Sequence, residues 1–107
     1  MDEFTVSTTA SGTAVRVAVR GDVDLATAEQ LQEAVVPLIR AGGEVGIDCA
    51  GIRFLDSAGL RVLLDLNRRA GAAGGELVLV APSDIVSRVL DLAGVAQMFT
   101  VRPAPVS

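Results

Sequence analysis

Apolar and polar side chains alternate along two stretches at the start of the chain. Residues 4–8 carry this period of two, and it returns in residues 13–20, where three valines fall on one face. Such alternation is typical of strands that are buried on one side. Small residues fill positions 9–12 and favour a turn. The pattern therefore predicts an opening β-hairpin.

The period then changes from that of a strand to that of a helix. Residues 21–24 (Gly-Asp-Val-Asp) are expected to break the second strand, because glycine and aspartate favour turns. Apolar residues follow at helical spacing: Ala28, Leu31, Val35 and Leu38. We expect Asp24 or Thr27 to cap this helix, since a short side-chain oxygen accepts hydrogen bonds from its free N–H groups. Pro37 should weaken the last turn.

Two further helices are predicted downstream. One covers residues 57–72, with an inner stripe formed by Leu60, Leu63, Leu64 and Asn67. Val62 and Arg69 then fall opposite this stripe, and Arg61 lies to one side. The other helix starts after Pro82 and ends at Gly94, a residue that favours helix termination.

Three more strands complete the pattern. Residues 44–49 predict a short strand that ends in a turn at residues 50–51. Residues 77–81 are a continuous apolar run, as expected of a central strand buried on both faces, and residues 98–101 add an edge strand. Strand–helix alternation after a hairpin implies an α/β fold, with a mixed β-sheet packed with helices. We expect one domain over residues 1–107.

Composition excludes several classes of function. The chain has no histidine and a single cysteine, which argues against a metal site and removes the imidazole that general-base catalysis most often uses. Its basic residues are nine arginines against 13 acids, and the net charge of −4 argues against nucleic acid and anionic membranes as partners. No motif implies a cofactor. Cys49 is expected to be a buried, inert thiol.

Location follows from the absence of two signals. No apolar stretch approaches the roughly 20 residues that a membrane span needs. The chain starts Met-Asp-Glu-Phe, which is acidic where a signal peptide would be basic. We therefore expect a cytoplasmic protein.

The segment before the second helix carries the most information. It begins at Asp48 and ends Leu55-Asp56-Ser57-Ala58-Gly59-Leu60, which places a serine where a helix starts. The plain interpretation is that aspartate and serine here are helix caps, each worth about 1 kcal/mol.

The same segment closely resembles the signature of the STAS domain, the fold of bacterial anti-sigma factor antagonists. Residues 21–24, 77–83 and 89–95 resemble three other segments of that family, in the same order and at similar spacing. Two departures stand out. Many relatives carry a second hydroxyl where this chain has Ala58, and many have threonine where this chain has Ala93.

The resemblance implies a regulatory protein and no enzymatic activity. In this family the unphosphorylated domain binds an anti-sigma factor that is also a serine kinase, and binding releases the sigma factor. The kinase phosphorylates the motif serine, the complex dissociates, and a serine phosphatase reverses the modification. By resemblance, Ser57 is the phosphorylated residue.

The partner is expected to bind around this serine. The candidate partner-binding residues are Asp22, Asp24, Asp56, Ser57, Ala58, Gly59, Arg61 and Val62. A phosphate adds about −1.5 to −2 charges, which the three aspartates would repel if residues 21–24 lie beside Ser57. A helix N-terminus tolerates an anion, so the switch should spare the fold.

Alternatives from other classes fit less well. A serine hydrolase needs a base and usually a Gly-x-Ser-x-Gly turn, and this chain has neither a histidine nor that turn. A nucleotide-binding module needs a phosphate-binding loop, which the glycine pairs at 42–43 and 74–75 do not form. The closest alternative is a STAS regulatory subunit of another bacterial signalling complex.

Overall fold

The structure is a computed structural model that describes residues 4–104. Residues 1–3, which include the acidic Asp2 and Glu3 on which the predicted location partly rests, lie outside the described part. The elements in chain order are β1 (Thr5–Ser11), β2 (Ala14–Val23), α1 (Ala28–Val35), the 3₁₀ helix η1 (Val36–Leu38), β3 (Glu44–Leu55), α2 (Ser57–Ala72), β4 (Glu76–Val80), α3 (Asp84–Ala93), the 3₁₀ helix η2 (Ala96–Met98) and β5 (Thr100–Arg102).

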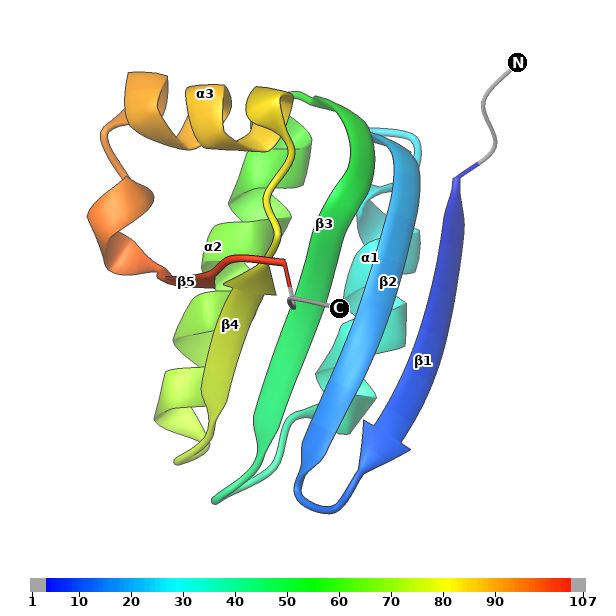
Figure 1. Ribbon diagram of the computed structural model, residues 1–107, viewed down its shortest axis with the longest axis vertical. Helices are drawn as coiled ribbons and strands as arrows, with labels where there is room; N and C mark the ends of the chain where they lie inside the picture. Colours follow the sequence, from blue (N-terminus) through cyan, green and yellow to red (C-terminus); the bar gives the residue numbers. More distant parts are fainter. Residues whose placement is uncertain (1–3, 105–107) are drawn as a thin grey trace.

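The five strands form one mixed sheet in the order β1-β2-β3-β4-β5. β1 pairs antiparallel with β2, and the remaining neighbours are parallel. Helices α1 and α2 cover one face of the sheet, and α3 lies across the end where β3 finishes (Figure 1). The predicted α/β fold with an opening hairpin is confirmed. Within residues 4–104, no helix has both the length and the apolarity that crossing a bilayer requires.

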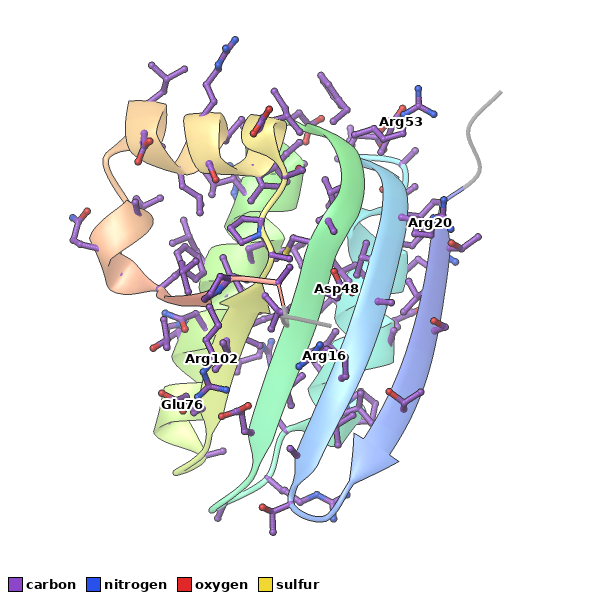
Figure 2. All side chains as sticks on the ribbon, viewed as in Figure 1. Arg16, Arg20, Asp48, Arg53, Glu76 and Arg102 are labelled. Carbon is purple, nitrogen blue, oxygen red and sulfur yellow. The ribbon has the colours of Figure 1, made fainter. Side chains whose placement is uncertain are left out.

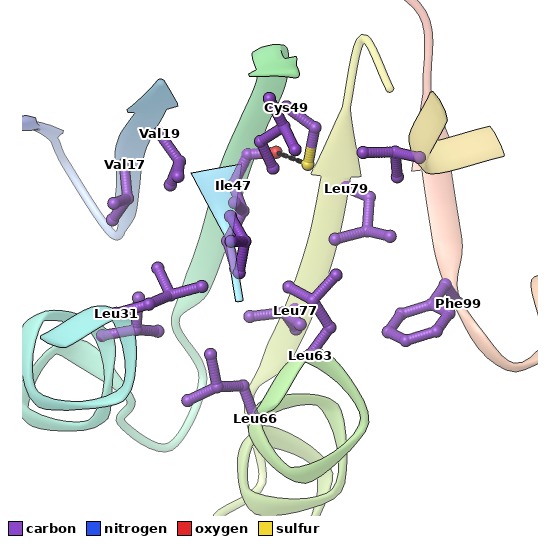
Figure 3. Close-up of a cluster of buried hydrophobic side chains, with 14 of the residues drawn as sticks. Val17, Val19, Leu31, Ile47, Cys49, Leu63, Leu66, Leu77, Leu79 and Phe99 are labelled. Atoms are coloured by element: carbon purple, nitrogen blue, oxygen red, sulfur yellow. Dashed lines mark hydrogen bonds between the residues drawn. The ribbon is translucent and has the colours of Figure 1, made fainter. Parts of the chain in front are cut away.

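The core lies between the sheet and the two helices on its covered face. Alternate residues of the strands supply one half of it: Val17, Val19, Ile47, Cys49, Leu77 and Leu79 (Figure 3). The helices supply Leu31, Leu63 and Leu66. Each of these side chains is at most 2% exposed, and full burial of an aliphatic residue contributes about 1.5–3 kcal/mol.

The opposite face of the sheet is covered by arginine side chains. Arg16 lies over Gly46, where a Cβ would come within 3.2 Å of Arg16 Nε (Figure 2). Arg102 reaches from β5 to β3 and donates two hydrogen bonds to Glu44, at 2.7 and 2.9 Å. The aliphatic stems of such residues shield the strands while their charged heads stay in water.

The predicted breaks at residues 21–24 and 50–51 are wrong. β2 continues to Val23 and β3 continues to Leu55, because the two strands remain paired through two register shifts, one between Ala18 and Arg20 and one between Gly21 and Asp22. Gly21 has a φ of 101°, which suits glycine. Local turn residues therefore form bulges here and leave the pairing intact.

The predicted inner stripe of α2 is also wrong in part. The buried residues of this helix are Gly59, Leu63, Leu66 and Ala70. Leu64 and Asn67 lie at the edge of the buried face and are only half-buried. Val62, expected on the opposite face, is half-buried and packs against the core. The helix is therefore rotated relative to the prediction.

Candidate functional site

Ser57 is the first residue of α2, and its side chain is exposed. The N-cap of the helix is Asp56, whose Oδ1 accepts a hydrogen bond from the Gly59 N–H at 2.9 Å. Within residues 4–104 the Ser57 hydroxyl has no hydrogen-bond partner. The capping role considered for both residues therefore falls to Asp56, and the hydroxyl of Ser57 stays free.

The turn between β2 and α1 lies directly beside this helix start. The Asp56 N–H donates to the Val23 carbonyl at 3.2 Å, and Asp56 Oδ2 accepts from the Leu25 N–H at 3.3 Å. Asp56 thus binds the helix with one carboxylate oxygen and the neighbouring turn with the other. These contacts bring residues 21–24 close to Ser57, as the predicted repulsion between aspartates and phosphate requires.

Asp24 builds the turn through its own side chain. Its Oδ1 accepts from the Ala26 and Thr27 N–H groups at 3.0 and 3.2 Å. The Thr27 hydroxyl donates to the Asp22 carbonyl at 2.7 Å. Thr27 is the N-cap of α1 by position, yet its hydroxyl makes no cap hydrogen bond. The side chains of Asp24 and Thr27 therefore hold this turn in place. At the start of α1, the Asp24 carbonyl accepts a hydrogen bond from the Ala28 N–H.

Three aspartates consequently lie in the segments that meet at the end of the sheet where Ser57 stands. Asp22 pairs in register with Phe54 on β3, Asp24 follows in the turn, and Asp56 precedes the serine. All three are half-buried. Within residues 4–104 no group of acidic or sulfur side chains could hold a metal ion. The arrangement supplies an accessible hydroxyl in an acidic setting.

Two exposed apolar side chains flank this cluster, and neither was predicted from the sequence. Leu25 is 80% exposed and Phe54 is 46% exposed. Leu25 belongs to the turn that Asp56 binds, and Phe54 lies opposite Asp22. Exposed apolar residues around a polar centre are typical of protein-binding surfaces. For Leu25, the sequence signal was an apolar residue inside a polar turn.

The remaining predicted residues divide between two sides of α2. Ala58 is half-buried, and Gly59 is buried against the end of β2. Arg61 is exposed one turn after Ser57, whereas Val62 points toward the core. Of these predicted residues, Arg61 is therefore exposed, whereas Gly59 is buried and Val62 packs against the core.

Comparison with known proteins places this geometry in a family. Residues 6–102 match the family model described as "Mlab, STAS domain". The anti-sigma-B factor antagonist of Bacillus subtilis is 28% identical over 87 residues, which cover 81% of this chain and 80% of that protein.

Solved structures share the fold. An anti-sigma factor antagonist from Mycobacterium paratuberculosis superposes with a TM-score of 0.81 at 25% identity, covering 97% of this chain and 87% of that chain. The Bacillus protein SpoIIAA superposes in its unphosphorylated form (TM-score 0.75, 22% identity, 96% of this chain and 89% of that chain). Its phosphorylated form does so too (TM-score 0.72, 21% identity, 96% and 92%).

Proposed function

Since the chain belongs to the STAS domain family, we propose that it is an anti-sigma factor antagonist whose binding is switched off by phosphorylation of Ser57. In this scheme the unmodified protein binds an anti-sigma factor that is also a serine kinase, and this binding releases the sigma factor. Transfer of a phosphoryl group from ATP to Ser57 ends the complex, and a serine phosphatase reverses the modification. The names of the similar proteins support the general role. The fold is shared with SpoIIAA, a protein known in unphosphorylated and phosphorylated forms.

The observation that carries the proposal is the free hydroxyl of Ser57. A kinase needs an accessible acceptor that the protein does not use for its own stability. Asp56 performs the capping, so Ser57 can be modified without loss of a structural hydrogen bond. A phosphate at this position also meets the free N–H groups and the positive end of α2, an interaction worth about 0.3–1 kcal/mol. Phosphorylation should therefore leave the fold intact.

The same phosphate opposes docking for two reasons. It joins the carboxylates of Asp22, Asp24 and Asp56, and two unit charges about 8 Å apart repel by about 2 kcal/mol at an effective dielectric constant of about 20. It must also lose hydration in a packed interface, which costs several kcal/mol more. Each 1.4 kcal/mol changes affinity about tenfold. Both effects together weaken binding by about a hundredfold or more.

Leu25 and Phe54 supply apolar attraction that the three aspartates do not. Both are exposed next to the acidic cluster, where a partner can bury them. Burial of apolar area contributes about 25 cal/mol per Å². We infer that the partner covers these two side chains and the start of α2 together.

The test combines modification and binding. The purified protein is incubated with candidate anti-sigma kinases and ATP, and the phosphate is mapped by mass spectrometry. Ser57→Ala should bind the kinase and remain unmodified, while Ser57→Asp should keep its circular dichroism spectrum and bind about a hundredfold more weakly. Ser7→Ala, which alters an exposed serine on β1, is the control and should behave as wild type. Full-strength binding by Ser57→Asp would refute the electrostatic switch.

A further inference from the structure

A groove lies beside α2, between this helix and η2. Its volume is about 560 Å³, and its lining residues are Arg61, Leu64, Asp65, Asn67, Arg68 and Met98. Met98 is 56% exposed and Leu64 is half-buried, so both walls offer apolar surface. The Asn67 side-chain amide donates to the Met98 carbonyl at 2.9 Å, which fixes the two walls relative to each other.

This groove continues the surface on which Ser57 stands. Ser57, Arg61, Leu64 and Arg68 follow one another at spacings of four, three and four residues along α2. Residues with this spacing lie on one face of a helix. The free hydroxyl is at the start of the face, and the groove lies one to three turns further on.

Arg61 is the uncompensated charge of this face. Within residues 4–104 its guanidinium has no hydrogen-bond or ion-pair partner. Asp65, one turn further along, is already occupied: Oδ1 accepts from Arg68 at 2.5 Å, and Oδ2 accepts from Arg69 at 2.7 Å and from Gln32 at 2.9 Å. The groove therefore presents a free cation beside apolar walls, on a chain whose net charge is −4.

We propose that this groove binds a segment of the anti-sigma factor that carries a carboxylate next to an apolar side chain, and that phosphate on Ser57 competes with that carboxylate for Arg61. This inference rests on the proposed function. It assigns to Arg61 a role in both states of the switch. In the unmodified protein Arg61 pairs with the partner, and in the phosphorylated protein it pairs with the phosphate of its own helix.

The geometry of a helix favours the second pairing. Residues four apart have Cβ atoms about 5–6 Å from each other, and an anion on the N-terminal side of a cation is the better orientation. Phosphate offers three acceptor oxygens, and the planar guanidinium can bind two of them at once. Phosphorylation would then both add repulsive charge and remove the group that attracts the partner.

The phosphate–arginine pair is tested without any partner. Phosphoserine is incorporated at position 57 during synthesis of the protein, and its second pKa is measured by ³¹P NMR. Arg61→Gln should raise the pKa of this phosphate by about 0.3 units or more, since a nearby cation stabilises the dianion. Arg88→Gln, which removes an exposed arginine of α3, is the matched control and should leave this pKa unchanged. Equal phosphate pKa values in wild type and Arg61→Gln would overturn the pairing.

The competition is tested with the anti-sigma factor identified by the kinase experiment above. Arg61→Gln should weaken binding of the unmodified protein about tenfold and leave the affinity of the Ser57-phosphorylated protein unchanged. Arg88→Gln should alter neither. If Arg61→Gln lowers the affinity equally in the two states, the phosphate does not compete with the partner for Arg61. If it lowers the affinity in neither state, the groove is not part of the interface. If no anti-sigma factor binds, the proposed function fails and the groove assignment fails with it, while the ³¹P measurement still decides whether Arg61 pairs with the phosphate.

Discussion

Gly59 lies directly against Val23, so that a Cβ on Gly59 would overlap the Val23 carbonyl oxygen. That Cβ would also come within 2.7 Å of Leu55 Cδ1. The close approach holds the first turn of α2 against the end of β2, and the Asp56 N–H donates to the same Val23 carbonyl. The position of Ser57 beside the acidic turn therefore depends on the absence of a side chain two residues later.

Gly59→Ala should destabilise the protein by about 1–3 kcal/mol, because backbone and core atoms must move to admit a methyl group. Gly71→Ala is the matched control within the same helix. A Cβ at Gly71 meets nothing within 4 Å, so this variant should gain about 0.5–1 kcal/mol from helix propensity. Urea denaturation of both variants measures the difference. Equal stability of the two variants would mean that Gly59 is not required by packing.

Asp56→Ala should cost about 0.5–2 kcal/mol, the usual loss for an N-cap, and should loosen the turn that contains Leu25. Asp56→Asn should cost less, because the amide oxygen can still accept from the Gly59 N–H. Its –NH₂ group cannot accept from the Leu25 N–H, so hydrogen exchange at Leu25 should be faster in Asp56→Asn than in wild type. Unchanged exchange at Leu25 would show that Asp56 does not hold the turn.

The periodic elements of this fold could be predicted from sequence, and the irregular ones could not. The valines of β2 and the apolar run of β4 are local patterns, and the structure confirms both strands. The extension of β3 beyond Gly51 depends on its pairing with β2, which no local pattern contains. On α2 the apolar residues are so numerous that several faces fit a buried stripe, and the contact between Gly59 and Val23 selects the one observed.

The candidate site divides in the same way. Ser57 was identified from its motif, because the residues that define it are contiguous in sequence. Aspartate and serine can both cap a helix, so only the structure shows that Asp56 takes the cap and leaves the hydroxyl free. Leu25 and Phe54 were missed because an apolar residue type does not reveal whether its side chain is buried or exposed.

Leu25→Ser should leave the free energy of unfolding within about 0.5 kcal/mol of wild type, since the side chain is 80% exposed. It should nevertheless weaken binding to the anti-sigma factor about tenfold, because the partner loses an apolar contact. Leu92→Ser is the control: Leu92 is 82% exposed and lies near the far end of α3. Isothermal titration of both variants measures the effect, and equal affinities would exclude Leu25 from the interface.

Asp65 should contribute a small stability that disappears in acid. Hydrogen bonds from Arg69 and Arg68 lower the pKa of this carboxyl below 3.8. A carboxyl whose pKa is lowered in the folded state contributes stability that is present at a pH above its unfolded-state pKa. This stability is lost as the pH falls through the folded-state pKa. Both ion pairs of Asp65 are open to solvent, so their contribution to the free energy of unfolding should stay below about 1 kcal/mol. Asp65→Asn should therefore be slightly less stable than wild type at pH 7, and this difference in the free energy of unfolding should disappear as the pH falls below 3.8. A difference that persists in acid would contradict the ion-pair account.

Cys49 should control the stability of the protein in alkali. Burial, with a smaller effect from the charge of Asp48, raises the pKa of its thiol from 9.0 to about 12, and the thiol donates to the Ile47 carbonyl at 3.3 Å. Because the pKa is raised in the folded state, the contribution of the thiol to stability is complete at a pH below the unfolded-state pKa. This contribution is lost as the pH rises toward the folded-state pKa. The chain contains no lysine and no tyrosine, so Cys49 is its only side chain expected to titrate between pH 9 and 12.

The free energy of unfolding should consequently fall between pH 9 and 12 with a slope approaching about 1.4 kcal/mol per pH unit, the value for one proton. Cys49→Ala removes the titrating group and should show a flat profile over the same range, from a lower starting stability caused by the cavity. Chemical denaturation at a series of pH values measures both slopes. Because the buried thiol stays protonated at pH 9 in the folded protein, a thiol reagent at this pH should label Cys49 no faster than the protein unfolds. Parallel pH profiles for wild type and Cys49→Ala would show that the thiol is not held protonated by the fold.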